Sequence, residues 1–416
     1  LGDPHATLQV YKTYDALKQD FLGEMDFISN IGAKFFIYPF IGRSKLITYC
    51  FYFTYGLLFL TLTQLLVTLG LIGINDCDWF EIINVAPNIG VCFMILNKYK
   101  KIQDNKELYD KIFKHFRLDL WEVVSDTTDH KKILKRYTLT TRLILRFEFY
   151  YTIVLAVVVD LFPRIIMVYQ NDILGGEKQY LYPFDGWYPF DKIQWYDAAY
   201  IWESFMTNVV IFIFVFVNML HVSYTRYICM ELKILGSTMQ GLISDEDMVQ
   251  IKKGREVGPT HDKIRNKLKF IICKHQYLAK ITSDLNEVLG AGMFHTYVFG
   301  SVFICLTAFT ATVVDDLYKS MRYFSFFCSL LVEVFFQCII GQLLIDHSNK
   351  LEQAIYFAEW VYADSNTKKM LLIFLMRTQK PFMFSARGYM VMNLDTFSGV
   401  CTGGLYLMSH LPLLVF

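Results

Sequence analysis

The stretch KLITYCFYFTYGLLFLTLTQLLVTLGL, from Lys45 to Leu71, has no acidic residue and no basic residue after its first position. A helix needs about 20 consecutive, mostly apolar residues to cross the hydrocarbon core of a bilayer. The stretch meets both conditions, so it predicts a membrane-spanning helix at about 46–72.

Six further segments have the composition of spanning helices, although Glu81, Asn84 and Asn88 make the first of them the most polar. Hydrophobic side chains form 54% of the 416 residues and the mean hydropathy is +0.33, above typical soluble domains. We therefore predict an all-α membrane protein with seven transmembrane helices. The six segments lie at about 79–97, 138–168, 197–224, 291–314, 322–345 and 386–416.

The positive charges predict the orientation of these helices. Of the 40 lysines and arginines, 34 lie in the segments 1–45, 98–142, 226–280 and 350–387, and 5 lie in the connections of the opposite side. Cytoplasmic loops carry an excess of positive charge. We therefore expect a cytoplasmic N-terminus and an extracellular C-terminus.

The two long polar segments also contain apolar residues at helical spacing. Examples are Leu108, Ile112 and Phe116 in one segment, and Leu268 and Ile272 in the other. This periodicity predicts that the spanning helices continue beyond the membrane as cytoplasmic extensions that form an anchor domain.

Two stretches resemble the insect odorant receptors. The predicted outer loop YLYPFDGWYPFD (Tyr180–Asp191) is similar to the proline- and aromatic-rich loop before the family's fourth segment. SARGYMVMNLDTFSGVCTGGLYLMSHL (Ser385–Leu411) resembles the family's last segment, where a small residue and Gly precede a Leu-x-x-Phe core, here Leu394 and Phe397. The family's frequent Tyr-Ser-Tyr is replaced by Leu-Tyr-Leu at 405–407, so the match is partial.

The resemblance implies an odorant or pheromone receptor that acts as a subunit of a ligand-gated, non-selective cation channel. Such a chain binds a small apolar volatile ligand, contacts membrane lipid and passes cations. It assembles as a heterotetramer with the odorant receptor co-receptor in the plasma membrane of an olfactory neuron dendrite. The segment 226–290 leaves no room for the co-receptor's longer loop, so we expect the ligand-specific subunit.

The resemblance also implies an organisation. Residues 1–416 form a single odorant-receptor-type domain, in which 46–345 make a six-helix ligand-binding bundle with cytoplasmic extensions. The segment 350–384 is expected to be an anchor helix, and 386–416 to be the last helix, which lines the pore. Subunit contacts are expected chiefly from 350–384 and 261–290.

Under this resemblance the ligand pocket lies in the outer half of the bundle, lined by aromatic and aliphatic side chains. An aromatic stripe in a membrane bundle also arises from packing or lipid contact, and this alternative stays open. The candidate ligand-binding residues are Ile83, Ala86, Thr152, Ile153, Ala156, Phe205, Met206, Val209, Phe299, Tyr323, Phe326, Phe327 and Leu330.

The small residues of the last segment have two explanations, an open pore lumen or close helix packing. The candidate pore and gate residues are Thr402, Tyr406, Ser409, His410 and Leu411. His410 occupies a position that is apolar in the family's gate, where it would make conductance sensitive to acid. Alternatively, it lies at the lipid–water interface.

Charged residues inside the predicted spans are expected to be paired, because an isolated charge in hydrocarbon is costly. Asp160 and Arg164 are four residues apart on one helix and can pair. Glu203 and Glu333 either attract cations or form interhelical hydrogen bonds.

Other classes of function find less support. The orientation and the absence of Asp-Arg-Tyr and Asn-Pro-x-x-Tyr disfavour a G-protein-coupled receptor, and the lack of internal repeats disfavours a secondary transporter. The sequence has no Gly-x-Ser-x-Gly, His-Glu-x-x-His or phosphate-loop motif, so we expect no enzyme, cofactor or metal. A net charge of +1 gives no indication of nucleic-acid binding.

Overall fold

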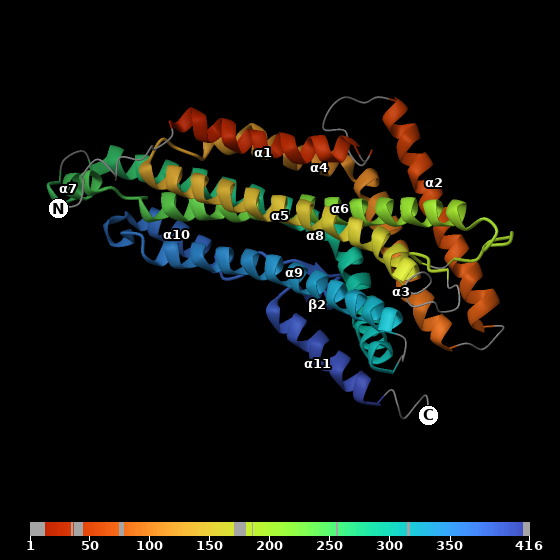
Figure 1. Ribbon diagram of the computed structural model, residues 1–416. Helices are drawn as coiled ribbons and strands as arrows, with labels where there is room; N and C mark the ends of the chain where they lie inside the picture. The colour runs from red at the N-terminus through yellow and green to blue at the C-terminus, as the bar shows by residue number, and fades with distance from the viewer. Residues whose placement is uncertain are drawn as a thin grey trace, which may run out of the picture.

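The fold is helical almost throughout (Figure 1). The computed structural model describes residues 13–34, 36, 45–74, 79–169, 180–184, 186–254, 257–313 and 317–410. Its helices are α1 (Tyr14–Lys34), α2 (Lys45–Thr68), α3 (Trp79–Asp104), α4 (Lys106–Arg117), α5 (Thr128–Val168), α6 (Tyr196–Gln240), α7 (Asp245–Lys252), α8 (Val257–Val313), α9 (Leu317–Tyr356), α10 (Ser365–Thr378) and α11 (Leu394–His410).

Five helical stretches in the described part of the chain are long and apolar enough to cross a membrane. They are Lys45–Leu71, Thr128–Val168, Tyr196–Lys252, Gly292–Thr312 and Ser320–Tyr356. Two of the seven predicted spans, α3 and α11, do not meet this criterion. The former carries several polar residues, and the latter has only 17 described residues.

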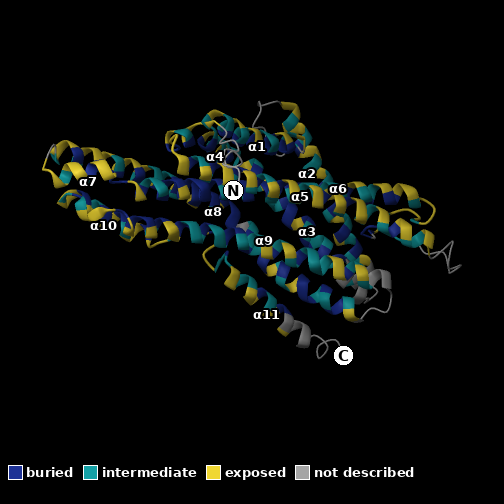
Figure 2. Cartoon of the chain, turned by 60° about the vertical axis from the view of Figure 1, so that its left-hand side comes forward, coloured by how far each residue is buried: buried dark blue, intermediate teal, exposed yellow. Residues whose placement is uncertain are grey.

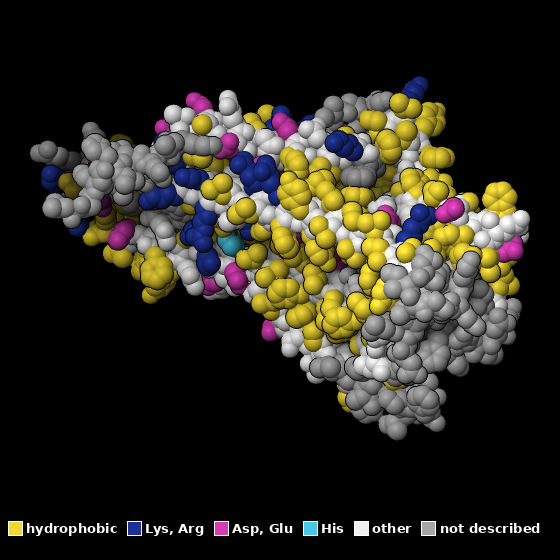
Figure 3. Space-filling model, in the orientation of Figure 1, with side chains coloured by type: hydrophobic (Ala, Val, Ile, Leu, Met, Phe, Trp, Pro, Cys, Tyr) yellow, Lys and Arg dark blue, Asp and Glu magenta, His cyan; other side chains and the backbone are white. Residues whose placement is uncertain are grey.

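Hydrophobic side chains cover much of the molecular surface around these stretches (Figure 3). On α5, for example, Leu143, Phe147 and Val154 are exposed, and they would be unfavourable in water. Charged side chains gather mainly toward the end of the molecule that carries α7 and α10. This separation is the one expected of helices surrounded by lipid that continue into an aqueous compartment.

Three helices are far longer than a bilayer requires. With 45 residues in α6, 57 in α8 and 40 in α9, they are roughly 60–85 Å long at about 1.5 Å per residue. They run side by side along the molecule (Figure 1). These three helices therefore continue well beyond their apolar stretches, and Leu268 and Ile271 of the continuing part of α8 are buried.

The core follows α6, which packs against α3, α5, α8 and α9. The residues coloured as buried lie mainly where the helices face one another (Figure 2). Among the largest are Phe216 and Tyr224 of α6 and Tyr109 and Phe116 of α4. The spacing predicted around Phe116 thus marks the face that α4 turns toward the core.

The predicted helix at 350–384 is divided in two. The end of α9 is followed by a 3₁₀ turn at Trp360–Tyr362, and α10 begins only at Ser365. The side chain of Asp364 accepts a hydrogen bond from the backbone N–H of Thr367 at 3.1 Å, so it caps the new helix.

The last helix also begins later than predicted, at Leu394 instead of 386. The preceding residues form an antiparallel hairpin of β1 (Ser385–Ala386) and β2 (Met390–Val391). Its turn needs positive φ at two positions, 51° at Arg387 and 79° at Gly388, which a helix does not allow.

We expect the part of α8 that precedes its apolar stretch to lose stability in acid because of His275. Its ring packs against Phe374 and Phe382, with centroid distances of 5.1 and 5.0 Å. Burial, aided by the charge of Arg377, lowers the pKa of His275 to about 4. As the pH falls from about 6.5 to about 4, His275 becomes protonated in the unfolded chain but stays neutral in the folded chain. This difference lowers the free energy of unfolding by about 3 kcal/mol.

The measurement is the thermal unfolding midpoint of the purified protein in detergent at about pH 7 and about pH 4.5. His275→Phe keeps an aromatic ring but cannot bind the proton, so its midpoint should fall less than that of the parent. An equal fall in both proteins would show that other groups cause the acid sensitivity.

Candidate ligand and pore site

The loop before α6 is held by one buried carboxylate. Glu203 is 0% exposed, and its two oxygens accept hydrogen bonds from the backbone N–H groups of Phe184 and Gly186, both at 3.0 Å. Oε1 also accepts one from the hydroxyl of Tyr188 at 3.2 Å. These three bonds all go to the loop that precedes α6 and not to another helix, so they differ from the interhelical hydrogen bonds expected for Glu203.

The same loop is also bound to α2. The backbone N–H of Trp187 donates to Oγ1 of Thr68 at 2.8 Å, and its carbonyl accepts from Gln64 at 3.1 Å. Gln64 in turn accepts a hydrogen bond from the indole of Trp202 on α6 at 3.1 Å. A Cβ at Gly186 would lie 2.6 Å from the Gln64 amide, so a larger residue there would displace the Gln64 side chain from its present position. The loop therefore ties α2 to α6.

The predicted ligand-binding residues divide by exposure, with most facing the interior. Thr152, Ala156, Met206, Tyr323 and Leu330 are buried, and Ala86, Val209, Phe299, Phe326 and Phe327 are half-buried. The side chain of Ile83 lies outside the described part of the structure.

Two predicted pocket residues, Ile153 and Phe205, face outward in the single chain. Phe205 is 51% exposed, whereas its neighbour Met206 is 0% exposed. Consecutive helical residues point about 100° apart, so a helix that buries Met206 or Thr152 turns the adjacent side chain away. Ile153 and Phe205 were expected to line an interior pocket. In the single chain they lie on its surface instead.

Polar contacts near the outer ends of α5 and α6 differ from the predicted pairing of Asp160 with Arg164. Arg164 lies 3.0 Å from Asp197 of α6, an exposed ion pair. Asp160 instead accepts a hydrogen bond from Nδ2 of Asn208 at 2.5 Å. Both contacts join α5 to α6, because the two carboxylates lie where the helices meet.

Deeper in the bundle, Glu333 of α9 joins three helices. Its carboxylate lies 3.5 Å from the ammonium of Lys98 on α3 and accepts a hydrogen bond from Nδ2 of Asn218 on α6 at 2.8 Å. Gln337, one turn further along α9, also donates to it. Glu333 is therefore an interhelical hydrogen-bonding residue, the second of the two explanations given above.

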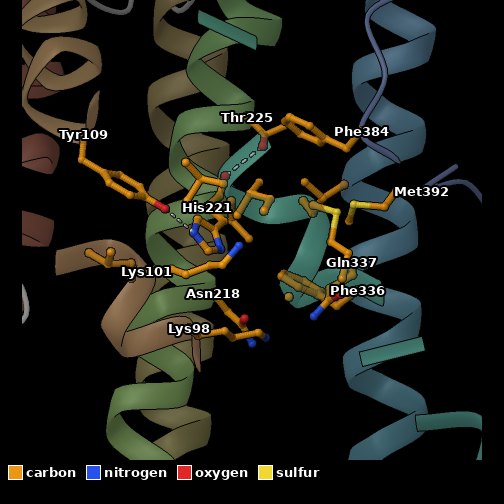
Figure 4. Close-up of a pocket in the computed structure, with 17 residues that line it drawn as sticks. Lys98, Lys101, Tyr109, Asn218, His221, Thr225, Phe336, Gln337, Phe384 and Met392 are labelled. Carbon is orange, nitrogen blue, oxygen red and sulfur yellow. Dashed lines mark hydrogen bonds between the residues drawn. The ribbon is translucent and has the colours of Figure 1, made fainter. Parts of the chain in front are cut away.

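A cavity of about 60 Å³ lies next to this network, between α3, α4, α6, α8, α9 and the hairpin before α11 (Figure 4). Its walls include Lys98, Asn218, Gln337 and Met392. None of the predicted ligand-binding residues whose side chains the structure describes lines it. Residues from six separate segments meet there, so no local pattern could have indicated this cavity.

The last helix has one packed face and one open face. Val400 and Gly404 are buried, and a Cβ at Gly404 would contact Ile304 of α8 at 3.7 Å. The exposed residues share the opposite face and are mostly small or polar: Ser398, Gly399, Thr402, Gly403 and Tyr406. Gly404 thus belongs to the packed face, while the side chains of Ser409 and His410, and all of Leu411, lie outside the described residues.

Long apolar helices, helical segments that continue beyond the apolar stretches and an open-faced last helix define a multi-pass, all-helical membrane protein. Residues 89–403 match the family described as the 7tm Odorant receptor. The chain belongs to this family of insect odorant receptors, which confirms the predicted family and the absence of an enzymatic role.

Relatives agree with this assignment. The chain is 30% identical over 132 residues to odorant receptor 49a of Drosophila melanogaster, a stretch covering 32% of this chain and 33% of that protein. It is 25% identical over 138 residues to the odorant receptor coreceptor of Aedes aegypti, covering 33% and 29%. The matched stretch thus spans about a third of each curated relative.

A solved structure shows the same fold over nearly the whole chain. The insect olfactory receptor OR5 from Machilis hrabei superposes with a TM-score of 0.76 at 15% identity, covering 94% of this chain and 99% of that one. The same receptor in complex with eugenol gives a TM-score of 0.76, covering 95% and 100%. The predicted seven-helix membrane fold is thereby confirmed.

Proposed function

We propose that the chain is a ligand-specific odorant or pheromone receptor that acts as one subunit of a ligand-gated, non-selective cation channel. The observation that carries this proposal is the exposed, small and polar face of α11. A spanning helix in lipid would expose apolar side chains, so such a face requires either a close partner or water. Copies of α11 arranged around a central axis would line an aqueous pore with Thr402 and Tyr406.

Assembly with the odorant receptor co-receptor in a heterotetramer is part of the proposal. Large apolar side chains are exposed on the segment 350–384, including Phe357, Leu372, Ile373 and Met376. The last three lie on α10, outside the apolar spans, where lipid would not cover them. This surface supports the expected role of 350–384 in subunit contacts.

The orientation belongs to the same proposal. With 34 of the 40 lysines and arginines in the segments assigned to one side, that side is cytoplasmic, together with the N-terminus. α7 and α10 then lie in the cytoplasm and the loop held by Glu203 faces outward. The C-terminus follows α11 to the extracellular side in the plasma membrane of an olfactory neuron.

The ligand would be a small apolar volatile compound bound among the buried outer residues of α5, α6 and α9. Met206 and Leu330 supply apolar surface, and burial of that surface provides most of the affinity. Thr152 already donates its hydroxyl proton to the carbonyl of Glu148 at 2.7 Å, so it can only accept from a ligand. A ligand that donates a hydrogen bond, as an alcohol does, is the type favoured.

The test is whole-cell current from cells that express the chain with and without an insect co-receptor, during application of volatile alcohols, aldehydes and esters. A fast inward current that needs both subunits and persists when G-protein signalling is blocked is the expected result. A response that needs G-protein coupling would favour a metabotropic receptor, and silence toward the whole panel would contradict the channel proposal.

Ligand contact can be tested with two adjacent residues. Met206→Ala removes apolar surface from the interior and is expected to raise the half-maximal ligand concentration roughly tenfold, a change of about 1.4 kcal/mol. Phe205→Ala on the same helix removes a side chain that faces outward, so the half-maximal concentration should stay nearly constant. Equal shifts in the two variants would place the ligand elsewhere.

A further inference from the structure

The cavity beside Glu333 has a positively charged wall. Lys98 and Lys101 lie three residues apart on α3 and therefore share a face, and both side chains extend toward α6 (Figure 4). No carboxylate belongs to the described residues that line the cavity. The wall thus attracts anions.

The two lysines differ in how their charge is balanced. The ammonium of Lys98 has Glu333 at 3.5 Å. Lys101 has no carboxylate within 4.0 Å among the described residues, and it is repelled by Arg387 of the hairpin and attracted by Glu287 of α8. A half-buried positive charge without a close partner is costly, and a bound anion would remove that cost.

The rest of the cavity indicates an amphiphile. Leu289, Met293 and Phe336 supply an apolar wall. Oε1 of Gln337 is buried without a hydrogen-bond partner in the described structure, so it can accept from a hydroxyl group. A cationic contact, a free acceptor and an apolar wall together match a phosphate head group joined to a hydrocarbon chain.

The position of the cavity relative to the membrane indicates that this ligand is a membrane lipid. Lys98 directly follows the span predicted at 79–97, and Gly292 begins the apolar part of α8. In the proposed orientation both mark the inner membrane boundary, where anionic phospholipid head groups lie and where basic pockets between helices bind them.

We propose that this cavity binds the head group of an anionic phospholipid of the inner leaflet, with Lys101 as its principal phosphate contact. A phosphoinositide suits the site, because its inositol hydroxyls can donate to Gln337. A soluble phosphate compound shares the anionic chemistry but has no hydrocarbon chain for the apolar wall.

A bound lipid would also touch the connection to the pore helix. Phe384 and Met392, at the two ends of the hairpin, line the cavity. The hairpin is held closely, since a Cβ at Gly290 would lie 2.9 Å from the carbonyl oxygen of Ser385 and one at Gly341 would lie 2.3 Å from that of Met392. Met392 lies two residues before α11 begins, so lipid binding should bias the position of α11. This step rests on the proposed channel function.

Binding is tested on the full-length chain in phosphatidylcholine nanodiscs, with fluorescent short-chain phosphatidylinositol 4-phosphate as the probe. Lys101→Gln should weaken binding by about fivefold or more, and Lys101→Arg should retain it. Lys100→Gln is the matched control, because Lys100 is the adjacent lysine on α3 and is exposed. Unchanged thermal unfolding without the probe verifies that each variant is folded.

Three outcomes would overturn the proposal: Lys101→Gln binding as tightly as the parent, Lys100→Gln losing as much as Lys101→Gln, or soluble inositol phosphate competing as well as the lipid. The last outcome would assign the site to a soluble anion. In excised patches, the lipid added to the inner face should change the odorant-evoked current of the parent but not of Lys101→Gln. If every variant lacks current while binding behaves as expected, the channel function has failed and the lipid site stands.

Discussion

Glu203→Ala is expected to remove most of the receptor from the cell surface and to abolish its odorant response. The change leaves the backbone N–H groups of Phe184 and Gly186 without their acceptor in a buried site, while the hydroxyl of Tyr188 keeps the carbonyl of Ala199 at 3.4 Å. Each unsatisfied buried donor costs about 1–3 kcal/mol, so the total is at least about 2 kcal/mol. The loop would detach from α6, and its hydrogen bonds to α2 would be weakened with it.

The measurement is surface labelling together with the thermal unfolding midpoint of the purified protein. Asp197→Ala provides the control, since Asp197 lies on the same helix but its side chain is 83% exposed. Its ion pair with Arg164 should contribute only about 0–1 kcal/mol. Normal surface levels and an unchanged midpoint for Glu203→Ala would show that the loop is held by other contacts.

Glu333→Leu should destabilise the bundle by about 3–5 kcal/mol, because it leaves the charge of Lys98 buried without its partner. The Lys98 side chain is only 9% exposed. The amide of Asn218 also loses its acceptor. Since these groups come from three helices, we expect the loss to affect the packing of α3 and α6 against α9.

The double variant Lys98→Met/Glu333→Leu separates this pairing from a general loss of packing. Replacing both charges with apolar groups of similar size should recover much of the stability. The unfolding free energies of the parent, both single variants and the double variant form a cycle whose coupling energy should exceed about 1 kcal/mol. Additive effects within about 0.5 kcal/mol would mean that the two charges act independently.

The helices could largely be predicted from the sequence, because long apolar runs and periodic spacing are local properties. The helical part of α8 before its apolar stretch could be predicted from the spacing of Leu268 and Ile272. The hairpin could not be predicted, because its strands have only two residues each and no periodicity. The position of the cap before α10 depended on a single residue, Asp364.

The site was predicted less well for a physical reason. A segment that is apolar on all sides does not reveal which face is buried, so Phe205 and Met206 were equally good candidates. Glu203 and Glu333 were recognised as unusual, but their partners could not be named from the sequence. Gln64 lies 123 residues from Trp187, and Lys98 lies 235 residues from Glu333. Contacts over such separations depend on how the helices are arranged.

Because α8 is one continuous helix, the directions of the side chains at its two ends are fixed relative to each other. One inserted residue between Leu285 and Gly292 would turn everything beyond it by about 100° and shift it by about 1.5 Å. Leu268 could then no longer face the core while Ile304 faced α11. An insertion within α8 is therefore expected to disrupt packing at one end of the receptor, whereas an insertion in a connection between helices would leave both contacts in place.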